Sequence, residues 1–240
     1  MVVLIFGIHP DDIELGCGGT AARCAAQGHR VVFVDLTRGE SSTNGTPDQR
    51  AREAQHAAVE LGCAHRESLG LPDGDIRSED PAQERAVVSA IRRVRPDVVL
   101  VPSADDPHPD HSAGAVLIER ALYRAGIAGY LTGPETHRAC RPAAVFVYSG
   151  RREVTPRIVI DISEYATAKM RAIVAHRSQF GTDAASRPTP LNAAGFMESV
   201  EARDVVCGRR IGVRRAEAFD TSGPVAVDDL SMFLAKGGGG

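Results

Sequence analysis

The pattern of hydrophobic positions along the chain predicts alternating strands and helices. Short apolar runs, several of them rich in β-branched residues, predict strands. They are Val2 to Phe6, Val31 to Leu36, Asp97 to Pro102, Ala143 to Ser149, Arg157 to Ile162 and Ile211 to Phe219. Longer segments that begin at capping residues or end at glycine predict helices between them. These segments cover residues 18–27, 46–62, 80–95, 112–126, 163–179 and 192–207.

Capping residues define the start of the second helix most clearly. Thr46 offers an N-cap hydroxyl, Pro47 is suited to the first helical position, and Gln49 stands where a capping-box partner belongs. Asp80 and Pro81 repeat the signal one helix later, and Ser163 is expected to cap the fifth helix. The helices are therefore expected to start close to these residues.

The order of elements predicts the fold class. Strands that are apolar on both faces and separated by helices are typical of a parallel sheet with helices on both sides. We expect a single α/β domain of Rossmann-like type over residues 1–236, because no linker or repeat interrupts the chain. The last four residues, 237–240, are all glycine and are expected to be disordered.

Composition excludes several classes of protein. The 240 residues are 43% hydrophobic and 25% charged, as in a folded globular chain, and no apolar run reaches the roughly 20 residues of a membrane helix. The net charge of −3 argues against a nucleic-acid partner. The N-terminus has no basic segment or cleavage site of a signal peptide, so a cytoplasmic protein is expected. Five cysteines without a C-x-x-C pair predict reduced thiols.

Two similar clusters of histidine and aspartate follow two of the predicted strands. The first reads His9-Pro10-Asp11-Asp12 and the second reads His108-Pro109-Asp110-His111. Because the carboxyl ends of parallel strands meet at one edge of a sheet, both clusters are expected at the same edge.

A divalent metal would organise these residues. A tight turn can present His9 and Asp12 together, and His111 can supply the third ligand. Two histidines and one carboxylate leave positions open for water and substrate, as in a catalytic zinc site. The same set also suits Fe²⁺. Asp11, His108 and Asp110 remain as acid–base groups, with either Asp11 or His108 able to protonate a leaving amine.

A competing interpretation comes from the glycines that follow the first cluster. Residues 16–21 match G-x-G-x-x-A, and Asp35 ends the next strand where a ribose-binding acid would stand. However, the charged segment 9–14 separates these glycines from the first strand, where a pyrophosphate needs a tight turn. A structural role, in which the glycines allow close packing of helix and sheet, is therefore preferred.

At the two clusters the chain resembles the PIG-L/LmbE-like family of zinc-dependent deacetylases. It is most similar to the branch that acts in bacillithiol biosynthesis. Further segments that carry the resemblance are Asp35 to Glu40, Asn44 to Thr46, Leu69 to Gly74, Pro134 to Arg138, Ser178 to Phe180, Ile211 to Val213 and Ala216 to Phe219. The similarity extends over residues 2–230.

The resemblance implies a role for each candidate residue. His9, Asp12 and His111 match the zinc ligands, and Asp11 matches the general base. His108 matches the histidine that polarises or protonates at the reacting centre, and Asp110 the residue that orients it. Arg50 and Arg138 match arginines near the substrate.

The resemblance also implies a substrate and an assembly. The expected reaction is hydrolysis of N-acetylglucosaminyl-L-malate to glucosaminyl-malate and acetate. A Rossmann-like fold and a homo-oligomer, a hexamer, are implied as well. Many members of this branch carry an arginine where this chain has Pro107, which bears on the identity of the substrate.

Overall fold

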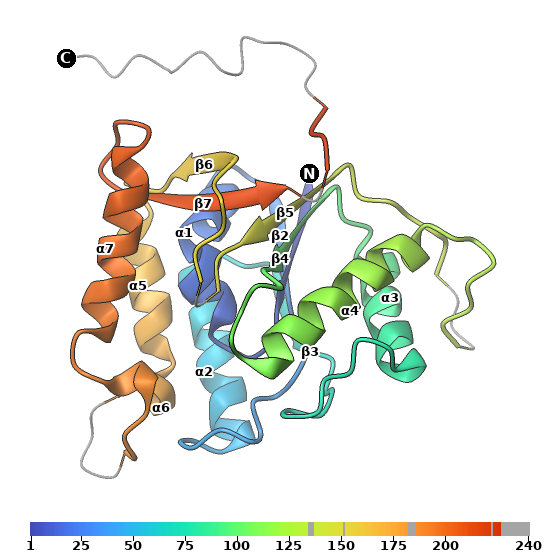
Figure 1. Ribbon diagram of the computed structural model, residues 1–240, viewed down its shortest axis with the longest axis horizontal. Helices are drawn as coiled ribbons and strands as arrows, with labels where there is room; N and C mark the ends of the chain where they lie inside the picture. Colours follow the sequence, from blue (N-terminus) through green and yellow to red (C-terminus); the bar gives the residue numbers. More distant parts are fainter. Residues whose placement is uncertain (134–136, 151, 182–185, 222, 227–240) are drawn as a thin grey trace.

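The structure is a computed structural model that describes residues 1–133, 137–150, 152–181, 186–221 and 223–226 (Figure 1). The predicted glycine tail 237–240 lies outside these residues, as do the first three residues of the segment 134–138. Among the helices described, none is both long and apolar enough to cross a membrane.

Seven strands form one sheet, in the order β3-β2-β1-β4-β5-β7-β6. The strands are β1 (Val2–Gly7), β2 (Arg30–Asp35), β3 (His65–Ser68), β4 (Val98–Pro102), β5 (Ala144–Tyr148), β6 (Ile158–Asp161) and β7 (Ala216–Thr221). The first five are parallel, whereas β7 runs antiparallel to both β5 and β6. The sheet is therefore mostly parallel, and its direction of winding switches between β1 and β4.

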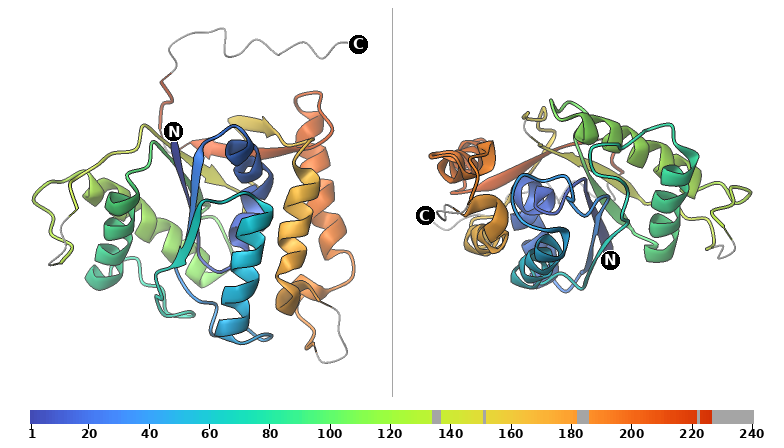
Figure 2. Two further views of the ribbon diagram at one scale, coloured as in Figure 1. Left: turned by 180° about the vertical axis from the view of Figure 1, so that it is seen from behind. Right: turned by 90° about the horizontal axis from the view of Figure 1, so that it is seen from below.

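Helices cover both faces of the sheet, as Figures 1 and 2 show. One face carries α1 (Asp12–Ala26), α2 (Pro47–Glu60), α5 (Ala166–Ala175), α6 (Arg177–Phe180) and α7 (Phe196–Arg209), and the other carries α3 (Pro81–Val94) and α4 (Pro109–Ala125). A hydrophobic core lies under each layer, with Phe6 on the side of α3 and α4 and Phe33 on the side of α1 and α2. The predicted α/β Rossmann-like class is confirmed.

Several elements differ from the sequence-based prediction. The helix expected from residue 112 begins at Pro109, and the last strand begins at Ala216 instead of Ile211. The first helix begins at Asp12 instead of Gly18, so the first histidine–aspartate cluster leads directly into it. The strand β3 was missed because its residues are polar, although Arg66 within it is buried. The expected helix 163–179 is divided at His176, and the Ser163 hydroxyl bonds the Asp161 carboxylate instead of capping the helix.

Two glycines of the first helix allow it to lie close against the sheet and a neighbouring loop. A Cβ at Gly16 would come within 2.3 Å of the Tyr148 ring, and one at Gly19 within 2.7 Å of the Ile162 side chain. A larger residue at either position would push α1 away from its neighbours. The glycines therefore have the packing role preferred from the sequence.

Candidate metal centre and substrate cavity

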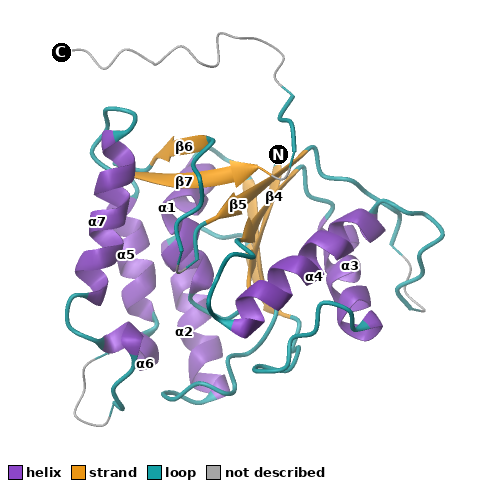
Figure 3. Cartoon of the chain, viewed as in Figure 1, coloured by secondary structure: helices purple, strands orange, loops and turns teal. Residues whose placement is uncertain are grey.

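Both histidine–aspartate clusters lie at the carboxyl ends of adjacent strands. His9, Asp11 and Asp12 follow β1 and lead into α1, while His108 is the N-cap residue of α4, beyond the end of β4. The two strands pair with each other at the centre of the sheet, where the winding direction changes. Figure 3 shows β4 within the sheet and α4 beside it. Such a switch point is the usual position of a binding crevice in an α/β sheet.

The side chains of His9, Asp12 and His111 point at one another. His9 Nδ1 lies 3.2 Å from His111 Nε2, His111 Nε2 lies 3.4 Å from Asp12 Oδ2, and His9 Nδ1 lies 3.8 Å from the same oxygen. Ligand atoms at about 2.0–2.2 Å from a tetrahedral zinc are roughly 3.3–3.6 Å apart, so these three separations suit one ion. Backbone N–H groups of Ile8 and His9 donate to Asp12 Oδ2 and fix its position.

Further carboxylates surround the two imidazoles. His9 Nε2 lies 3.0 Å from Asp73 Oδ1 and 3.5 Å from Asp110 Oδ2, and His111 Nδ1 lies 3.3 Å from Asp106 Oδ2. A carboxylate on the remote nitrogen of a metal-binding histidine orients the ring and increases its basicity. The sequence analysis did not identify Asp73 or Asp106 as site residues. Asp73 lies in the segment Leu69 to Gly74, which carries the family resemblance, and Asp106 lies two positions before the second cluster.

The protonation of these groups reflects an excess of negative charge. Burial alone would lower the pKa of His9, but hydrogen bonds to Asp110 and Asp73 and the charge of Asp12 raise it to about 10. Burial would also lower the pKa of His111, but the charge of Asp12 and the hydrogen bond with Asp106 outweigh this effect and raise it. A site that attracts protons this strongly also attracts a cation, and its nitrogen and oxygen donors suit a divalent metal. The residues present therefore fit the predicted metal.

A second group of possible ligands overlaps with the first. His9, His108 and Asp110 also bring one ligand atom each within 4.8 Å of the others. The two groups share only His9, whose two ring nitrogens face opposite sides. The first group combines short separations with a carboxylate held by two backbone N–H groups, so it fits a metal ion better than the second.

Asp11 has an unusual backbone conformation and a buried ionic partner. Its φ angle of 128° is rare for a residue with a side chain and is typical of strained positions at functional sites. Asp11 Oδ2 accepts a hydrogen bond of 3.0 Å from Arg50 Nη2, and both side chains are almost fully buried. Burial raises the pKa of Asp11 to about 6, against the opposing charge of Arg50. The carboxyl group is thus held in place beside the metal ligands.

His108 lines the cavity, and its side chain caps the start of α4. Its Nδ1 accepts a hydrogen bond of 3.2 Å from the backbone N–H of Asp110. A nitrogen that accepts carries no proton, so the proton of the neutral ring is on Nε2. The centroid of the His108 ring is 5.0 Å from that of His9 and 4.8 Å from that of His111, which places the ring beside two of the candidate metal ligands.

Two further predicted residues, Asp110 and Arg50, lie beside the cluster and bond its residues. The Asp110 carboxylate contacts His9 and accepts from the backbone N–H groups of Gly74 and Ile76. Arg50 lines the cavity, but its guanidinium donates to Asp11 and to the carbonyls of Pro10 and Gly39.

Arg138 is not brought to this site. It is exposed, and its carbonyl accepts from Arg95 next to the amino end of β4, at the opposite edge of the sheet. The structure therefore gives Arg138 no contact with the cavity of its own chain.

A cavity of about 760 Å³ opens above the cluster. Its floor contains His9, Asp11, Asp12, His108 and His111. The lining includes a polar group, residues 41–43 and Gln179, and next to it a largely apolar wall formed by residues 188–191 and Phe196. This volume lies in the upper part of the roughly 300–1,000 Å³ range of small-molecule sites.

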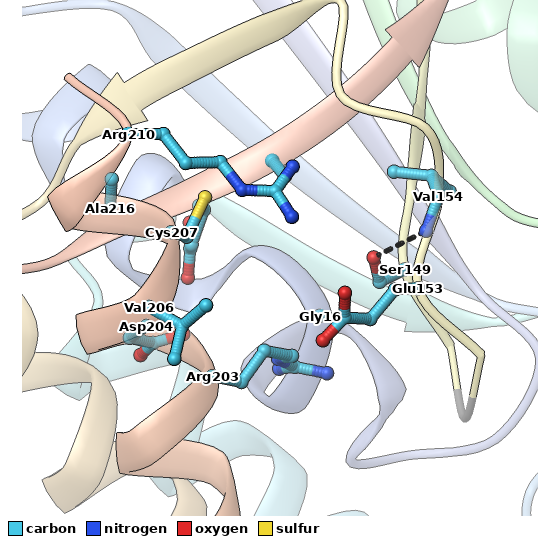
Figure 4. A pocket seen from close by; sticks show the side chains of 12 residues that line it. Gly16, Ser149, Glu153, Val154, Arg203, Asp204, Val206, Cys207, Arg210 and Ala216 are labelled. Carbon is cyan, nitrogen blue, oxygen red and sulfur yellow. Dashed lines mark hydrogen bonds between the residues drawn. The ribbon is translucent and has the colours of Figure 1, made fainter.

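A much smaller recess of about 30 Å³ adjoins the large cavity (Figure 4). Gly16, Ser149, Glu153 and Arg203 line both spaces. Figure 4 shows the hydrogen bond of 3.1 Å from the Val154 N–H to Ser149 Oγ, which holds the loop between the two spaces. The recess has room for one or two water molecules only.

The acid that a dinucleotide would require is already engaged. Asp35 forms two hydrogen bonds with Arg66, of 2.7 and 3.0 Å, and both side chains are buried. The glycines of residues 16–21 lie inside α1 instead of forming a loop before it. The structure therefore does not support the competing dinucleotide interpretation.

Comparisons with known proteins agree with this geometry. The family profile described as "PIG-L: GlcNAc-PI de-N-acetylase" matches residues 4–122. The chain is 30% identical to the diacetylchitobiose deacetylase of Thermococcus kodakarensis over 75% of this chain and 71% of that protein. It is 28% identical to a probable N-acetyl-α-D-glucosaminyl L-malate deacetylase 2 of Bacillus anthracis, over 75% of this chain and 82% of that one.

A solved structure is also similar. A conserved protein of Thermus thermophilus superposes with a TM-score of 0.84 at 35% identity, and the match covers 95% of this chain and 98% of that one. The likeness therefore includes the C-terminal elements beyond residue 122.

Proposed function

The chain belongs to the PIG-L family of deacetylases, and we propose that it removes the acetyl group from an N-acetylglucosaminide by metal-dependent hydrolysis. The observation that carries the proposal is the convergence of His9, Asp12 and His111 beside Asp11 at the floor of a cavity large enough for a sugar. Curated relatives are named as deacetylases of N-acetylglucosamine derivatives, which supports this substrate class.

We propose Zn²⁺ as the ion, with Fe²⁺ as the alternative, held by His9, Asp12 and His111. When bound, such an ion polarises a carbonyl group and lowers the pKa of water. The nitrogen and carboxylate donors suit either metal, and thiolate ligands are absent from this set.

Asp11 acts as the base in this proposal. Its carboxylate lies one residue before a proposed ligand, and Arg50 holds Oδ2. The other oxygen, which has no hydrogen-bond partner among the residues described, can take a proton from the attacking water. Asp11 can afterwards return that proton to the nitrogen of the leaving amine. An amine cannot leave the tetrahedral intermediate as an anion, so this protonation is essential.

His108 stabilises the negative oxygen that develops on the acetyl carbonyl. Its Nε2–H can donate to that oxygen because the Asp110 N–H occupies Nδ1. A well-placed donor of this kind contributes about 10²–10³-fold to the rate. The backbone of Asp110 thus orients His108, and its carboxylate holds His9.

The identity of the sugar derivative is a finer proposal. The malate conjugate expected from the sequence is one candidate, supported by the 28% identical relative. A related amidase acting on a thiol conjugate or another N-acetyl sugar is the alternative. Hexamer formation also stays a prediction, and sedimentation analysis of the purified chain tests it.

One assay tests the proposed activity. We expect acetate release from N-acetylglucosamine and its glycosides, its loss after treatment with a chelator, and its recovery with Zn²⁺ or Fe²⁺. Asp11→Asn should retain the metal and lose acetate release. Failure to release acetate from any N-acetylated sugar, by a preparation that contains the metal, would overturn the proposal.

A further inference from the structure

We propose that residues 188–191 and Phe196 form a binding subsite for an apolar aglycone, meaning the group attached to C1 of the sugar. This inference rests on the proposed deacetylase function and narrows its substrate class to glycosides with an apolar aglycone, in preference to the charged malate conjugate. It assigns a role to residues 188–191 and Phe196, which lie outside the two histidine–aspartate clusters.

The wall consists mainly of apolar residues that line the cavity. Pro188 and Pro190 are exposed, and Leu191 and Phe196 are partly exposed. All four line the cavity that also contains the proposed metal ligands. The Phe196 ring stacks on the Phe180 ring, with centroids 5.8 Å apart, which fixes its orientation. Apolar groups left accessible inside a cavity gain free energy when a ligand covers them.

The wall is held in position before any ligand binds. Asn44 Nδ2 donates to the Arg187 carbonyl at 2.8 Å, and the Arg187 N–H donates to Asn44 Oδ1 at 2.9 Å. Asn192 caps the short helix Pro190–Asn192 by accepting from the Thr189 N–H at 2.8 Å. The fixed φ angles of the two prolines add further rigidity. A preformed surface of this kind binds without a large ordering cost.

The adjoining polar part of the lining has the complementary chemistry. Ser41, Ser42 and Thr43 bring hydroxyl groups to the cavity, and Gln179 is held there by its hydrogen bond of 2.7 Å to the Asn44 carbonyl. Hydroxyl and amide groups of this kind suit the hydroxyls of a sugar ring. The lining of the cavity therefore has a polar part next to an apolar part.

The chemistry of the substrate matches this division. The acetamido group is attached to C2, and the aglycone is attached to the neighbouring C1. A sugar whose amide reaches Asp11 at the floor must therefore place its aglycone within the same cavity, close to the reacting group. With the sugar hydroxyls on the polar part of the lining, an apolar aglycone falls on Pro188, Pro190, Leu191 and Phe196.

A homologous series of substrates tests the subsite. We measure acetate release from methyl, butyl and phenyl glycosides of N-acetylglucosamine, in both anomeric forms, with the metal-loaded enzyme. For the anomer that is turned over, kcat/KM should rise at least about 10-fold from methyl to phenyl, mainly through a lower KM, because more apolar surface is covered.

Two variants locate the effect. Leu191→Ser should reduce the phenyl-to-methyl ratio of kcat/KM to within about 3-fold of one. Asn44→Ala removes the two side-chain hydrogen bonds to the Arg187 backbone and leaves the side chains of the wall unchanged. It should raise KM for the phenyl glycoside more than for the methyl glycoside. Leu131→Ser is the matched control, since Leu131 is 68% exposed and does not line the cavity, and it should leave the ratio unchanged. Thermal unfolding of each variant confirms that it is folded.

The outcomes separate the two proposals. If no glycoside releases acetate, the proposed function is wrong. If acetate is released but the ratio is flat in the wild type, or is the same in folded Leu191→Ser and Leu131→Ser, the deacetylase stands and the apolar subsite is wrong.

Discussion

Arg50 Nη2 lies 3.0 Å from Asp11 Oδ2, and the two side chains are only 4% and 6% exposed. The same guanidinium donates to the carbonyls of Pro10 and Gly39, so Arg50 joins the loop before α1, the loop after β2 and the helix α2. The sequence had suggested that Arg50 contacts substrate. From these contacts we infer a different role for Arg50, the positioning of the proposed base.

Replacement of Arg50 should therefore affect turnover more than binding. Arg50→Lys retains a positive charge but not the three fixed contacts, so Asp11 loses its alignment. We expect kcat to fall on the order of 10²-fold, as for a small misplacement of a reacting group, while KM stays within about 3-fold. Steady-state kinetics measures both.

The neighbouring Arg52 provides the control, because it is exposed on the same helix. Arg52→Lys should match the wild type. A raised KM with unchanged kcat in Arg50→Lys would instead support the carboxylate-binding role expected from the sequence.

Asp106 should contribute to metal affinity without touching the metal. Its carboxylate lies 3.3 Å from His111 Nδ1, on the far side of the ring from the proposed ion, and its side chain is fully buried. Partners of this kind typically account for about 10–100-fold in affinity. Asp106→Asn should therefore weaken Zn²⁺ binding by about that factor in a chelator competition.

The adjacent Asp105 is the matched comparison. It is exposed and pairs with Arg152 at the surface. Equal Zn²⁺ affinities of Asp105→Asn and Asp106→Asn would show that His111 does not depend on its buried partner.

The buried cluster of Arg66, Asp35 and Glu14 should be important for stability. Arg66 bonds both carboxylates with a side chain that is 1% exposed, and its charge lowers the pKa of Glu14 to about 2 against the effect of burial. Arg66→Met leaves two buried carboxylates without their cation, which should cost about 3–5 kcal/mol of unfolding free energy. Urea unfolding at neutral pH measures this loss.

Arg93 forms an exposed ion pair with Glu67, one residue along from Arg66. Arg93→Met should cost about 1 kcal/mol or less, as surface pairs do. A loss at Arg66 no larger than that at Arg93 would contradict the buried network.

Protonation of Glu84 should contribute to the loss of folding stability at acidic pH. Burial alone would raise its pKa, but hydrogen bonds from Tyr130 and Arg120 and the charge of Arg124 lower it below the ordinary 4.5. A lowered pKa means that the carboxylate stabilises the fold above pH 4.5 and that this contribution disappears as the pH falls through the folded-state pKa. Glu84→Gln should thus be less stable than the wild type at pH 7, and this difference in stability should shrink as the pH falls below 4.5.

Urea midpoints across this pH range give the comparison, with the exposed Glu79→Gln as the control. A stability gap between wild type and Glu84→Gln that stays constant from pH 7 to pH 3 would show that the ion pairs do not act through the charge of Glu84.

Local patterns were sufficient for most of the fold. Val2 to Phe6 is apolar at every position because β1 lies in the middle of the sheet between two helical layers, and Thr46 and Asp80 cap helices through their own side chains. β3 could not be recognised, since Arg66 and Glu67 are polar and the burial of Arg66 depends on Glu14 and Asp35 from other elements.

The candidate site divides in the same way. His9, Asp12 and His111 belong to two short segments that a parallel sheet necessarily brings to one edge. Asp73, in contrast, contacts His9 across 64 positions of sequence through a loop without regular structure. The position of Arg138 at the other edge depends on the path of a long connection that no local pattern defines.

The most direct test of the account is the stoichiometry of metal binding. Metal-free protein should bind one Zn²⁺ per chain in a calorimetric titration and regain acetate release in proportion, whereas His111→Ala should bind at least about 100-fold more weakly and stay inactive. Full acetate release by the metal-free protein, or wild-type Zn²⁺ affinity in His111→Ala, would contradict the shared site of His9, Asp12 and His111.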